Sequence, residues 1–488
     1  MDQGFPRKRG LTPSRWDRRG FLKAAVSSVA IATKPTNLRA AARAPAETVL
    51  IVGAGLAGLC AAHRLREAGK RVIVIEARPL PGGRVRTLRG YFDDGIYAEL
   101  GAARVAESHE YVLNWVNDLG LSLTPFAPAG ATVQVLNNQR ALSDDEAARE
   151  RLAPDLHRDE RGLTSGELLR KYTEGVPEEL GHGDVDLSNP RWREYDALTW
   201  PAWLAARGAS KGASQLMMLG GDSSTFSALF LLQQIMLHRD LRQYHKIAGG
   251  MDSLPRGIAA RLNNVIRYNC ELVRLERSGS GVRAVCKQGD RMETIPADRA
   301  VLAIPFSMLK RVALDPPFSP AKMSILAELS YYPGTRFLLQ TKSRFWQAAR
   351  LNGGARTDGP ADIWDMSFGQ RGGRGLISLT TGNAAIEQKL VAMNPAARLT
   401  VGVGLAAAAF PEINAQMEKS TIQRWTEEPY ARGAFVVFRP GQMTRWAPAL
   451  SRSEGRVHFA GEHTAPWNGW MEGALWSGER VAQEILQQ

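Results

Sequence analysis

The 488-residue chain is 44% hydrophobic and 23% charged, the composition of a globular protein large enough for two or three packed units. No apolar run is long enough to cross a bilayer, so no stable membrane anchor is expected. The formal net charge is +13, but residues 1–44 hold ten basic and two acidic residues (+8), against 52 basic and 47 acidic residues (+5) in the remainder. This distribution excludes the broad basic surface of a nucleic-acid-binding protein.

The first 44 residues have the organisation of an export signal. An arginine pair at 18–19 precedes an apolar pair at 21–22, and a weakly apolar stretch follows over 24–33. Small residues at 42 and 44 suit a signal peptidase. This order resembles a twin-arginine signal; the alternative is a disordered basic tail. We therefore expect a periplasmic or secreted protein that is exported after it has folded.

A strand, a glycine-rich loop and a helix follow the leader. Residues 48–52, Thr-Val-Leu-Ile-Val, are an apolar and β-branched run typical of a buried parallel strand. Glycines interrupt this run over 53–58, and residues 59–68 have the apolar spacing of a helix that ends at Gly69. A second buried strand is expected over 71–76.

Farther along the chain, the pattern is first helical and then mixed. Residues 107–247 are mostly helix-like, with long polar connections. Strand-like runs are expected at 282–286, 299–304, 336–341 and 433–438. A helix over 470–486 closes the chain.

The loop over residues 53–58, Gly-Ala-Gly-Leu-Ala-Gly, has the spacing of a dinucleotide-binding turn. Gly53 permits the tight turn, Gly55 lets a pyrophosphate approach the backbone, and Gly58 lets the helix pack close to the strand. Glu76 ends the next strand, where an acid can hydrogen-bond the ribose hydroxyls of adenosine. Together these features predict a site for FAD or NAD.

The segment after this strand distinguishes FAD from NAD. Glu76-Ala77-Arg78 is followed by Pro81-Gly82-Gly83-Arg84-Val85, which resembles the E-A-x-x-x-x-G-G-R segment of the flavin amine oxidase superfamily. The resemblance implies that Gly83 brings backbone close to FAD and that Arg84 supplies positive charge to the pyrophosphate. Arg78 is expected in the same site.

The resemblance extends along most of the chain after the leader. Residues 99–104, Glu-Leu-Gly-Ala-Ala-Arg, are similar to a motif of L-amino-acid oxidases, and residues 249–255 are similar to a glycine-rich turn of the family. The most specific block is C-terminal, with Phe-Ala-Gly-Glu-His-Thr at 459–464 and Gly-Trp-Met-Glu-Gly-Ala at 469–474. The further FAD contacts that the family implies are Ala103, Arg104, Val273, Glu462, Trp470 and Met471.

The C-terminal block also predicts how the flavin is held. A helix that starts near Trp470 would direct its positive N-terminal dipole at the flavin and stabilise the anionic reduced form. Family members with covalent flavin use a cysteine near this block, but no cysteine follows Cys286, so non-covalent FAD is expected. Cys60, Cys270 and Cys286 are interpreted as buried hydrophobic residues, with no disulfide framework and no metal site.

Amine oxidation by FAD removes a hydride equivalent from the carbon that bears nitrogen and gives an imine that water hydrolyses. The protein must position the C–H bond, exclude water and favour the neutral amine. Trp425 and Trp470 are the expected aromatic walls. The resemblance implies that Arg104 binds the α-carboxylate of an L-amino acid; the alternative is a salt bridge between domains.

Two positions depart from the family pattern. Leu379 is expected where a family strand usually presents a tyrosine to the same carboxylate, which would remove one partner. Arg336 stands where many amine oxidases have a lysine that holds a water beside the flavin, and arginine is bulkier and does not deprotonate. Since that lysine is tied to oxygen reactivity in the family, the electron acceptor could be oxygen or a redox protein such as a cytochrome.

The predicted fold is α/β, with a Rossmann-like FAD-binding domain, a mixed-sheet substrate domain and a helical insertion. Expected boundaries are 1–44 for the signal, 48–106, 249–325 and 440–488 for the FAD-binding domain, 107–130 and 326–439 for the substrate-binding domain, and 131–248 for the helical domain. The chain could also form a homodimer.

The predicted function is that of an L-amino-acid oxidase that yields a 2-oxo acid, ammonia and hydrogen peroxide. The first alternative is an oxidase or dehydrogenase of a non-acidic primary or secondary amine. A flavin desaturase that acts on a carbon–carbon bond, and a FAD-stabilised binding protein without activity, are the remaining hypotheses.

Overall fold

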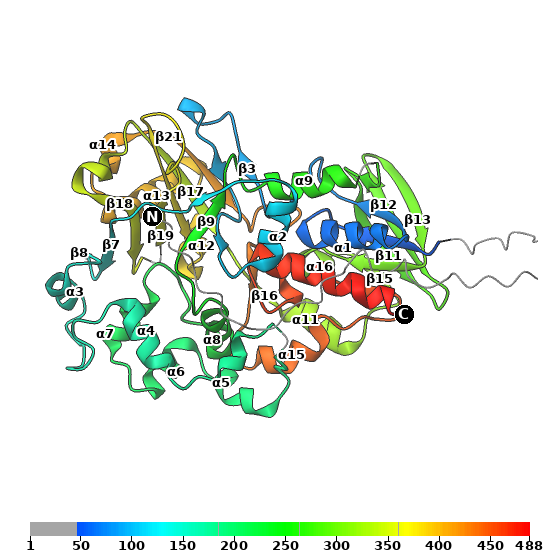
Figure 1. Ribbon diagram of the computed structural model, residues 1–488, viewed down its shortest axis with the longest axis horizontal. Helices are drawn as coiled ribbons and strands as arrows, with labels where there is room; N and C mark the ends of the chain where they lie inside the picture. The colour runs from blue at the N-terminus through cyan, green and yellow to red at the C-terminus, as the bar shows by residue number, and fades with distance from the viewer. Residues whose placement is uncertain (1–45, 184, 263, 360) are drawn as a thin grey trace, which may run out of the picture. The chain divides into compact units, whose positions relative to one another are not determined.

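The computed structural model describes residues 46–488 except 184, 263 and 360. The predicted export signal lies outside the described residues. Among those that are described, no helix has both the length and the apolar character needed to span a membrane. The fold is mixed α/β, as predicted, and its elements are shown in Figure 1.

A five-stranded parallel sheet joins three distant stretches of the chain. Its order is β10 (Ile266–Arg267), β2 (Arg71–Ile75), β1 (Thr48–Val52), β14 (Arg299–Leu302) and β23 (Val457–Phe459). Every neighbouring pair is parallel. The strands predicted from their apolar runs at 48–52 and 71–76 are therefore the centre of this sheet.

Alternate side chains of this sheet enter two different cores, because successive residues of a strand point to opposite faces. Val49 and Ile51 pack with the helices α1 (Leu56–Glu67) and α16 (Met471–Leu486), whereas Leu50 and Val52 enter the core on the other side. The helices α1 and α16 lie side by side in Figure 1. They approach closely at Gly478, where a Cβ would lie 2.4 Å from the backbone oxygen of Ala57.

Two further layers complete the FAD-binding side. The helices α2 (Glu110–Asp118) and α9 (Ser253–Arg261) contribute to the core of α1 and α16. A four-stranded sheet contributes to the opposite core, in the order β13 (Arg291–Ala297), β12 (Val282–Gln288), β11 (Glu271–Arg277) and β15 (Ala313–Asp315). The parallel sheet thus lies between helices and a second sheet, as in a Rossmann-like dinucleotide-binding domain.

A seven-stranded mixed sheet is the largest sheet among the described residues. Its order is β21 (Met417–Arg424), β17 (Thr335–Thr341), β20 (Gly375–Thr381), β19 (Ala361–Asp365), β18 (Leu351–Thr357), β7 (Ala131–Leu136) and β8 (Gln139–Leu142). Only β18 and β7 pair in parallel. One face, which includes Phe337 and Leu379, packs in a core with residues of α13 (Pro395–Ala409). The other face, which includes Leu338 and Trp364, packs against residues 92–103.

The helical insertion is shorter than predicted. Its helices are α3 (Glu146–Leu152), α4 (Ser165–Thr173), α5 (Arg193–Ala197), α6 (Trp200–Ala206), α7 (Lys211–Met218) and α8 (Ala228–Leu237). Residues 131–142 are instead strands of the seven-stranded sheet, which fits the alternating sequence Ala-Thr-Val-Gln-Val-Leu at 131–136. Residues 110–118, assigned to the substrate domain from sequence, form α2 and pack with α1 and α16.

Shorter elements connect these layers. A three-stranded sheet has the order β5 (Val105–Ala106), β9 (Tyr244–Ile247) and β6 (Leu123–Pro125), and two pairs are β3 (Thr87–Leu88) with β4 (Ala98–Glu99) and β16 (Ser330–Tyr332) with β22 (Phe435–Val437). The remaining α-helices are α10 (Phe306–Leu309), α11 (Pro320–Glu328), α12 (Ala384–Val391), α14 (Ile413–Gln416) and α15 (Gln442–Leu450).

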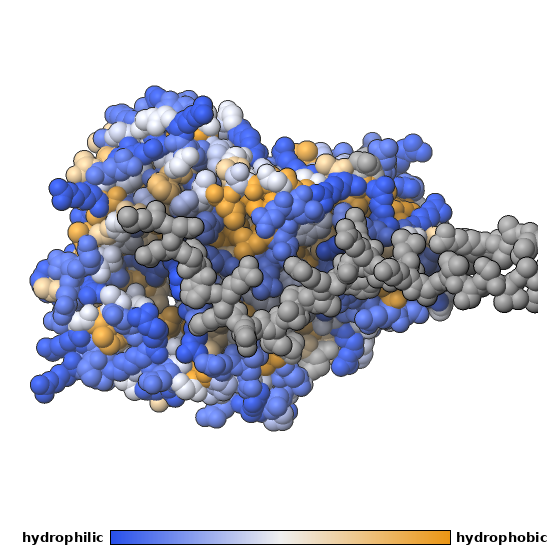
Figure 2. Space-filling view, viewed as in Figure 1, coloured by the Kyte–Doolittle hydropathy of each residue, from blue (hydrophilic) through white to orange (hydrophobic). Residues whose placement is uncertain are grey.

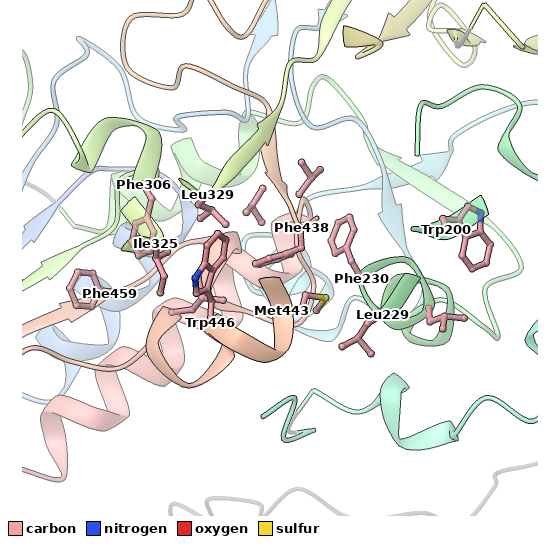
Figure 3. Packing of buried hydrophobic residues seen from close by; sticks show 14 of the residues in the cluster. Trp200, Leu229, Phe230, Phe306, Ile325, Leu329, Phe438, Met443, Trp446 and Phe459 are labelled. Carbon is pink, nitrogen blue, oxygen red and sulfur yellow. The ribbon is translucent and has the colours of Figure 1, made fainter. Parts of the chain in front are cut away.

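One continuous core joins the helical insertion to the FAD-binding side. Figure 3 shows Phe459, a residue of β23, beside Phe306. Trp446 and Phe438 lie between these rings and Phe230, a residue of α8. Figure 2 shows that the face in view is mostly hydrophilic, with apolar residues gathered near its middle. Because the core is continuous, the insertion is fixed against the FAD-binding side instead of being tethered by a linker.

Candidate active site

A cavity of about 1410 Å³ runs from the glycine loop to the seven-stranded sheet. Gly55 and Glu76 line one part, Arg84 and Glu462 line another, and Arg104 lies among the residues of the sheet. Pockets for one small ligand usually measure roughly 300–1,000 Å³. This cavity therefore has room for a dinucleotide and a small substrate together.

The glycine loop has the shape that a pyrophosphate requires. Gly53 has a φ of +103°, and a Cβ on Gly58 would lie only 2.0 Å from the Gly53 oxygen. In contrast, a Cβ on Gly55 would meet no atom within 4 Å. The helix α1 begins beside this open space with no side-chain cap, so its free N–H groups can bind the phosphate oxygens.

Glu76 is fixed at the adenosine end of the cavity. Its carboxylate accepts hydrogen bonds from the backbone N–H groups of Ala54 (2.7 Å) and Arg78 (2.9 Å). Burial raises its pKa, and the two N–H groups oppose that shift. Val273 lines the same cavity, so these residues suit an adenosine group.

An ion pair organises the middle of the cavity. Arg84 Nη1 lies 2.7 Å from Glu462 Oε1 and 2.9 Å from the Ala434 oxygen. Glu462 also accepts a hydrogen bond from the Gly469 N–H at 2.9 Å, which holds the turn before α16. Glu462 is thus fixed by protein partners, and Arg84 links the glycine-rich segment to the C-terminal block.

The N-terminus of α16 also faces the cavity. Trp470 caps this helix without a side-chain hydrogen bond, and both Trp470 and Met471 line the cavity. The uncapped N–H groups give this wall a partial positive charge. The cavity shape, the fixed acid and the two uncapped helix starts fit FAD.

Most of the remaining predicted FAD contacts line the cavity. Gly83, Ala103 and Arg78 line the cavity, and Arg78 forms an ion pair with Glu428 at 2.9 Å. Gly58 does not line it and acts through the close packing of loop and helix. The residues around the cofactor thus come from segments that are far apart in the sequence.

Three polar residues form a row across the seven-stranded sheet at the other end of the cavity. Arg336 on β17 is paired in register with Thr380 on β20, which is paired with Asp362 on β19. Register partners share one face of a sheet, and all three line the cavity. Thr380 Oγ1 accepts a hydrogen bond from Arg336 Nε at 3.0 Å, which leaves the hydroxyl proton for another acceptor.

Arg104 faces this row from the segment before β5. Its Nη2 donates to Asp362 Oδ2 at 2.6 Å. Its guanidinium carbon lies 4.7 Å from the ring centre of Phe126 and 4.8 Å from that of Trp364. Arg104 is thus held by aromatic rings and a carboxylate, with its side chain 29% exposed toward the cavity.

Arg336 is held by main-chain oxygens. Its Nη1 donates to the oxygens of Glu99 at 2.7 Å and Gly101 at 2.6 Å. Burial and the nearby charge of Arg104 lower its pKa to about 10. Arg336 remains a fixed cation at neutral pH.

The prediction for Leu379 is wrong by one position. Its side chain is fully buried among Phe337, Ile363 and Ile377 on the far face of the sheet, and it does not line the cavity. Thr380 is the residue of this strand that faces the cavity, because neighbouring residues of a strand point to opposite faces. The residue of this strand that faces the cavity therefore carries a hydroxyl.

Both tryptophans predicted as walls line the cavity. Trp425 is 4% exposed, and its Nε1 donates to the Leu100 oxygen at 2.9 Å. Trp470 stacks on Tyr244, with ring centres 5.8 Å apart and planes at 11°. Each of these two aromatic walls is thus fixed by a residue that is far away in the sequence.

A pair of histidines packs against Trp470. His109 and His238 have ring centres 5.0 and 4.7 Å from that of Trp470, and their Nε2 atoms are 3.1 Å apart. His109 Nδ1 accepts from the Ala106 N–H at 3.2 Å, and His238 Nδ1 lies 2.8 Å from the Gln234 oxygen. If His109 carries its proton on Nε2 and His238 carries its proton on Nδ1, each of these contacts has one donor and one acceptor. Both rings are neutral in this arrangement.

The substitution His109→Phe is expected to reduce the dependence of stability on pH. Burial and the neighbouring His238 lower the pKa of His109 to about 3, against 6.5 for an exposed histidine. Below pH 6.5 the unfolded chain therefore binds a proton at His109 that the folded chain does not bind. The contribution of neutral His109 to the stability of the native state is lost as the pH falls below 6.5. The difference in free energy of unfolding between wild type and variant should change by about 2 kcal/mol between pH 7 and pH 5.

Urea unfolding of both proteins at a series of pH values would measure this difference. The wild type should lose stability relative to the variant as the pH falls. Parallel curves for the two proteins would contradict the assignment of a neutral His109.

Several residues at the substrate end were not predicted. They are Asp362, Thr380, Tyr244, His238, Tyr332 and Asp222, which all line the cavity. Asp362 had a detectable signal, since it is a charged residue inside the strand Ala-Asp-Ile-Trp-Asp. His238 had none, because its role depends on a ring that is far away in the sequence.

The comparisons with known proteins agree with this geometry. A family model described as flavin containing amine oxidoreductase matches residues 56–486. An L-amino-acid oxidase of Siganus canaliculatus is 30% identical over 461 residues, which cover 90% of this chain and 85% of the relative. An L-amino-acid oxidase of Gloydius halys is 28% identical over 452 residues, 90% of this chain and 88% of the relative.

Solved structures are similar in fold. Wild-type putrescine oxidase bound to putrescine superposes with a TM-score of 0.77 at 21% identity, over 91% of this chain and 99% of that one. Cyclohexylamine oxidase from Brevibacterium oxydans gives a TM-score of 0.76 at 23% identity, over 91% and 100% of the two chains.

Proposed function

Because this chain belongs to the family of flavin-containing amine oxidoreductases, we propose that its substrate is an L-amino acid, bound by its carboxylate at Arg104. The chain is an enzyme that uses FAD to oxidise the carbon–nitrogen bond of an amine. Its proposed products are a 2-oxo acid, ammonia and the reduced electron acceptor.

The observation that carries the proposal is the pair of anchors at the end of the cavity. Arg104 presents a partly exposed guanidinium there. Thr380 has a hydroxyl proton that Arg336 does not use. A guanidinium and a hydroxyl together suit a carboxylate, which can accept hydrogen bonds on both oxygens. The relatives named L-amino-acid oxidase support the same assignment.

The protein residues would bind and orient the substrate without acting as nucleophiles. Bound FAD supplies the acceptor for the hydride equivalent that leaves the α-carbon. Arg104 and Thr380 would fix the carboxylate and so restrict the position of the α-carbon. Trp470, Tyr244 and Trp425 would keep water from that region and favour the neutral amine.

A non-acidic amine is the second candidate substrate, and one contact favours it. Arg104 already has a carboxylate partner, Asp362, at 2.6 Å. A site for amines would have no need of an unpaired arginine. The putrescine and cyclohexylamine oxidases are similar in fold.

The electron acceptor and the location of the enzyme are part of the proposal. Arg336 supplies a bulkier, permanent charge where the family has a lysine tied to oxygen reactivity. A redox protein is therefore proposed as an alternative to oxygen as the electron acceptor. Export by the twin-arginine route would place the enzyme in the periplasm. The homodimer, the lack of a nucleic-acid partner and the non-covalent attachment of FAD stay predictions from sequence.

The test is a product assay on the purified holoenzyme. A panel of L-amino acids and their decarboxylated amines would be supplied with either oxygen or cytochrome c. Formation of 2-oxo acid and ammonia from amino acids supports the proposal, whereas products from the amines alone would contradict it. Turnover that requires cytochrome c would identify a redox protein as the acceptor.

A further inference from the structure

Asp362 stands where a substrate carboxylate would bind. Its Oδ2 accepts from Arg104 Nη2 at 2.6 Å, and its side chain is 30% exposed toward the cavity. Nη2 carries two N–H groups, and each of them takes part in one of the two arrangements by which a guanidinium binds a carboxylate through parallel hydrogen bonds. The hydrogen bond to Asp362 uses one of these two N–H groups. Asp362 therefore occupies part of the surface that a ligand would need.

The position of Asp362 in the sheet supports the same conclusion. It lies next to Thr380 in register, and Thr380 lies next to Arg336. A carboxylate that reached Arg104 and Thr380 would therefore be close to the negative charge of Asp362. The two negative charges would repel each other, and more strongly in a partly buried cavity than in water.

We propose that Asp362 is a specificity-determining residue that competes with the substrate carboxylate for Arg104. This inference rests on the proposed function. Asp362 keeps Arg104 paired in the absence of substrate and must give up that hydrogen bond when a carboxylate binds. It lowers the affinity for every carboxylate ligand and leaves amines without a carboxylate unaffected.

The position of the Arg104 guanidinium does not depend on Asp362. The guanidinium of Arg104 lies between Phe126 and Trp364, at 4.7 and 4.8 Å from their ring centres. Cations bind to aromatic faces at such distances. Removal of the charge of Asp362 should therefore leave Arg104 in place and weaken the competition for its Nη2.

The test measures the binding of benzoate, a carboxylate that cannot be oxidised, by its perturbation of the visible flavin spectrum. Asp362→Asn keeps the shape and an acceptor oxygen but removes the charge. We expect the Kd for benzoate to fall by about tenfold, and the KM for oxidised L-amino acids to fall similarly with kcat within about twofold. Asp362→Ser serves as a second variant with the same expectation.

A matched control separates the contact from the general charge of the cavity. Asp222 also lines the cavity, but its carboxylate accepts from Asn383 and Ser224 and makes no contact with Arg104. Asp222→Asn should change the Kd for benzoate by less than about twofold. An equal effect of both variants would overturn the proposal, as would an unchanged or raised Kd in Asp362→Asn.

A pair of substrates tests the main competing role for Asp362. L-lysine and L-norleucine have similar lengths but differ in side-chain charge, and both should improve alike in Asp362→Asn. A loss for L-lysine with a gain for L-norleucine would mean that Asp362 binds a cation, and would overturn the proposal. If no amino acid is oxidised by the wild type, the proposed function fails, yet the benzoate titration still decides the role of Asp362.

Discussion

Arg104→Gln should reduce kcat/KM for L-amino acids by about 10²–10⁴-fold. The glutamine side chain cannot donate two parallel, charge-assisted hydrogen bonds to a carboxylate. Each such bond contributes about 1.5–3 kcal/mol, and loss of two bonds corresponds to about two to four factors of ten in kcat/KM. Initial rates over a range of substrate concentrations would measure the change.

The controls for Arg104 are a conservative variant and a second class of substrate. Arg104→Lys keeps the positive charge but not the paired donors, so its kcat/KM should lie between those of the wild type and Arg104→Gln. Rates with the matched decarboxylated amines should change little. Equal losses for amino acids and amines would show that Arg104 acts only through Asp362 and the structure of the cavity.

Gly58→Ala should destabilise the protein and abolish retention of FAD. A Cβ at this position would lie 2.0 Å from the Gly53 oxygen and 3.2 Å from the Ala303 side chain. Since the first contact is with backbone, the loop must move, and overpacking of this kind costs about 1–3 kcal/mol. The flavin content after purification and the midpoint of thermal unfolding would measure both effects.

Gly55→Ala is the matched control, because it affects the cofactor without affecting the fold. Gly55 has a φ of −75°, which any residue can adopt, and a Cβ there would meet no protein atom within 4 Å. The stability of the apoprotein should therefore stay within about 0.5 kcal/mol of wild type. The added methyl group would occupy the space assigned to the pyrophosphate, so the affinity for FAD should fall by tenfold or more. An unchanged affinity would contradict that assignment.

The glycine loop could be predicted from sequence because its function depends on local backbone geometry. Gly53 needs a positive φ and Gly58 needs close packing. Both requirements select glycine within one short loop, so the sequence contains a recognisable motif. Glu76 can be predicted for the same reason, since it directly follows the second strand of this domain. The C-terminal block was found through its resemblance to a family.

The substrate end could be predicted only in part, because it depends on strand register and on contacts between distant segments. The difference between Leu379 and Thr380 is one residue, yet it moves the side chain from the cavity to the opposite core. The partner of Arg104, Asp362, is 258 residues away in sequence. The sequence predicts a helical domain over 131–142 because these two strands lie within a stretch whose pattern is mostly helical, although residues 131–136 alternate as a strand does.

The most direct test of the proposed carboxylate site is the rate of flavin reduction under anaerobic conditions, which does not depend on the electron acceptor. The wild-type holoenzyme would be mixed rapidly with L-phenylalanine or with 2-phenylethylamine, which lacks the carboxylate, and with other such pairs. We predict rapid loss of the oxidised flavin spectrum with one or more L-amino acids and slow or no loss with their amine partners. Reduction by the amines alone, or by both at equal rates, would contradict a binding site for a carboxylate at Arg104.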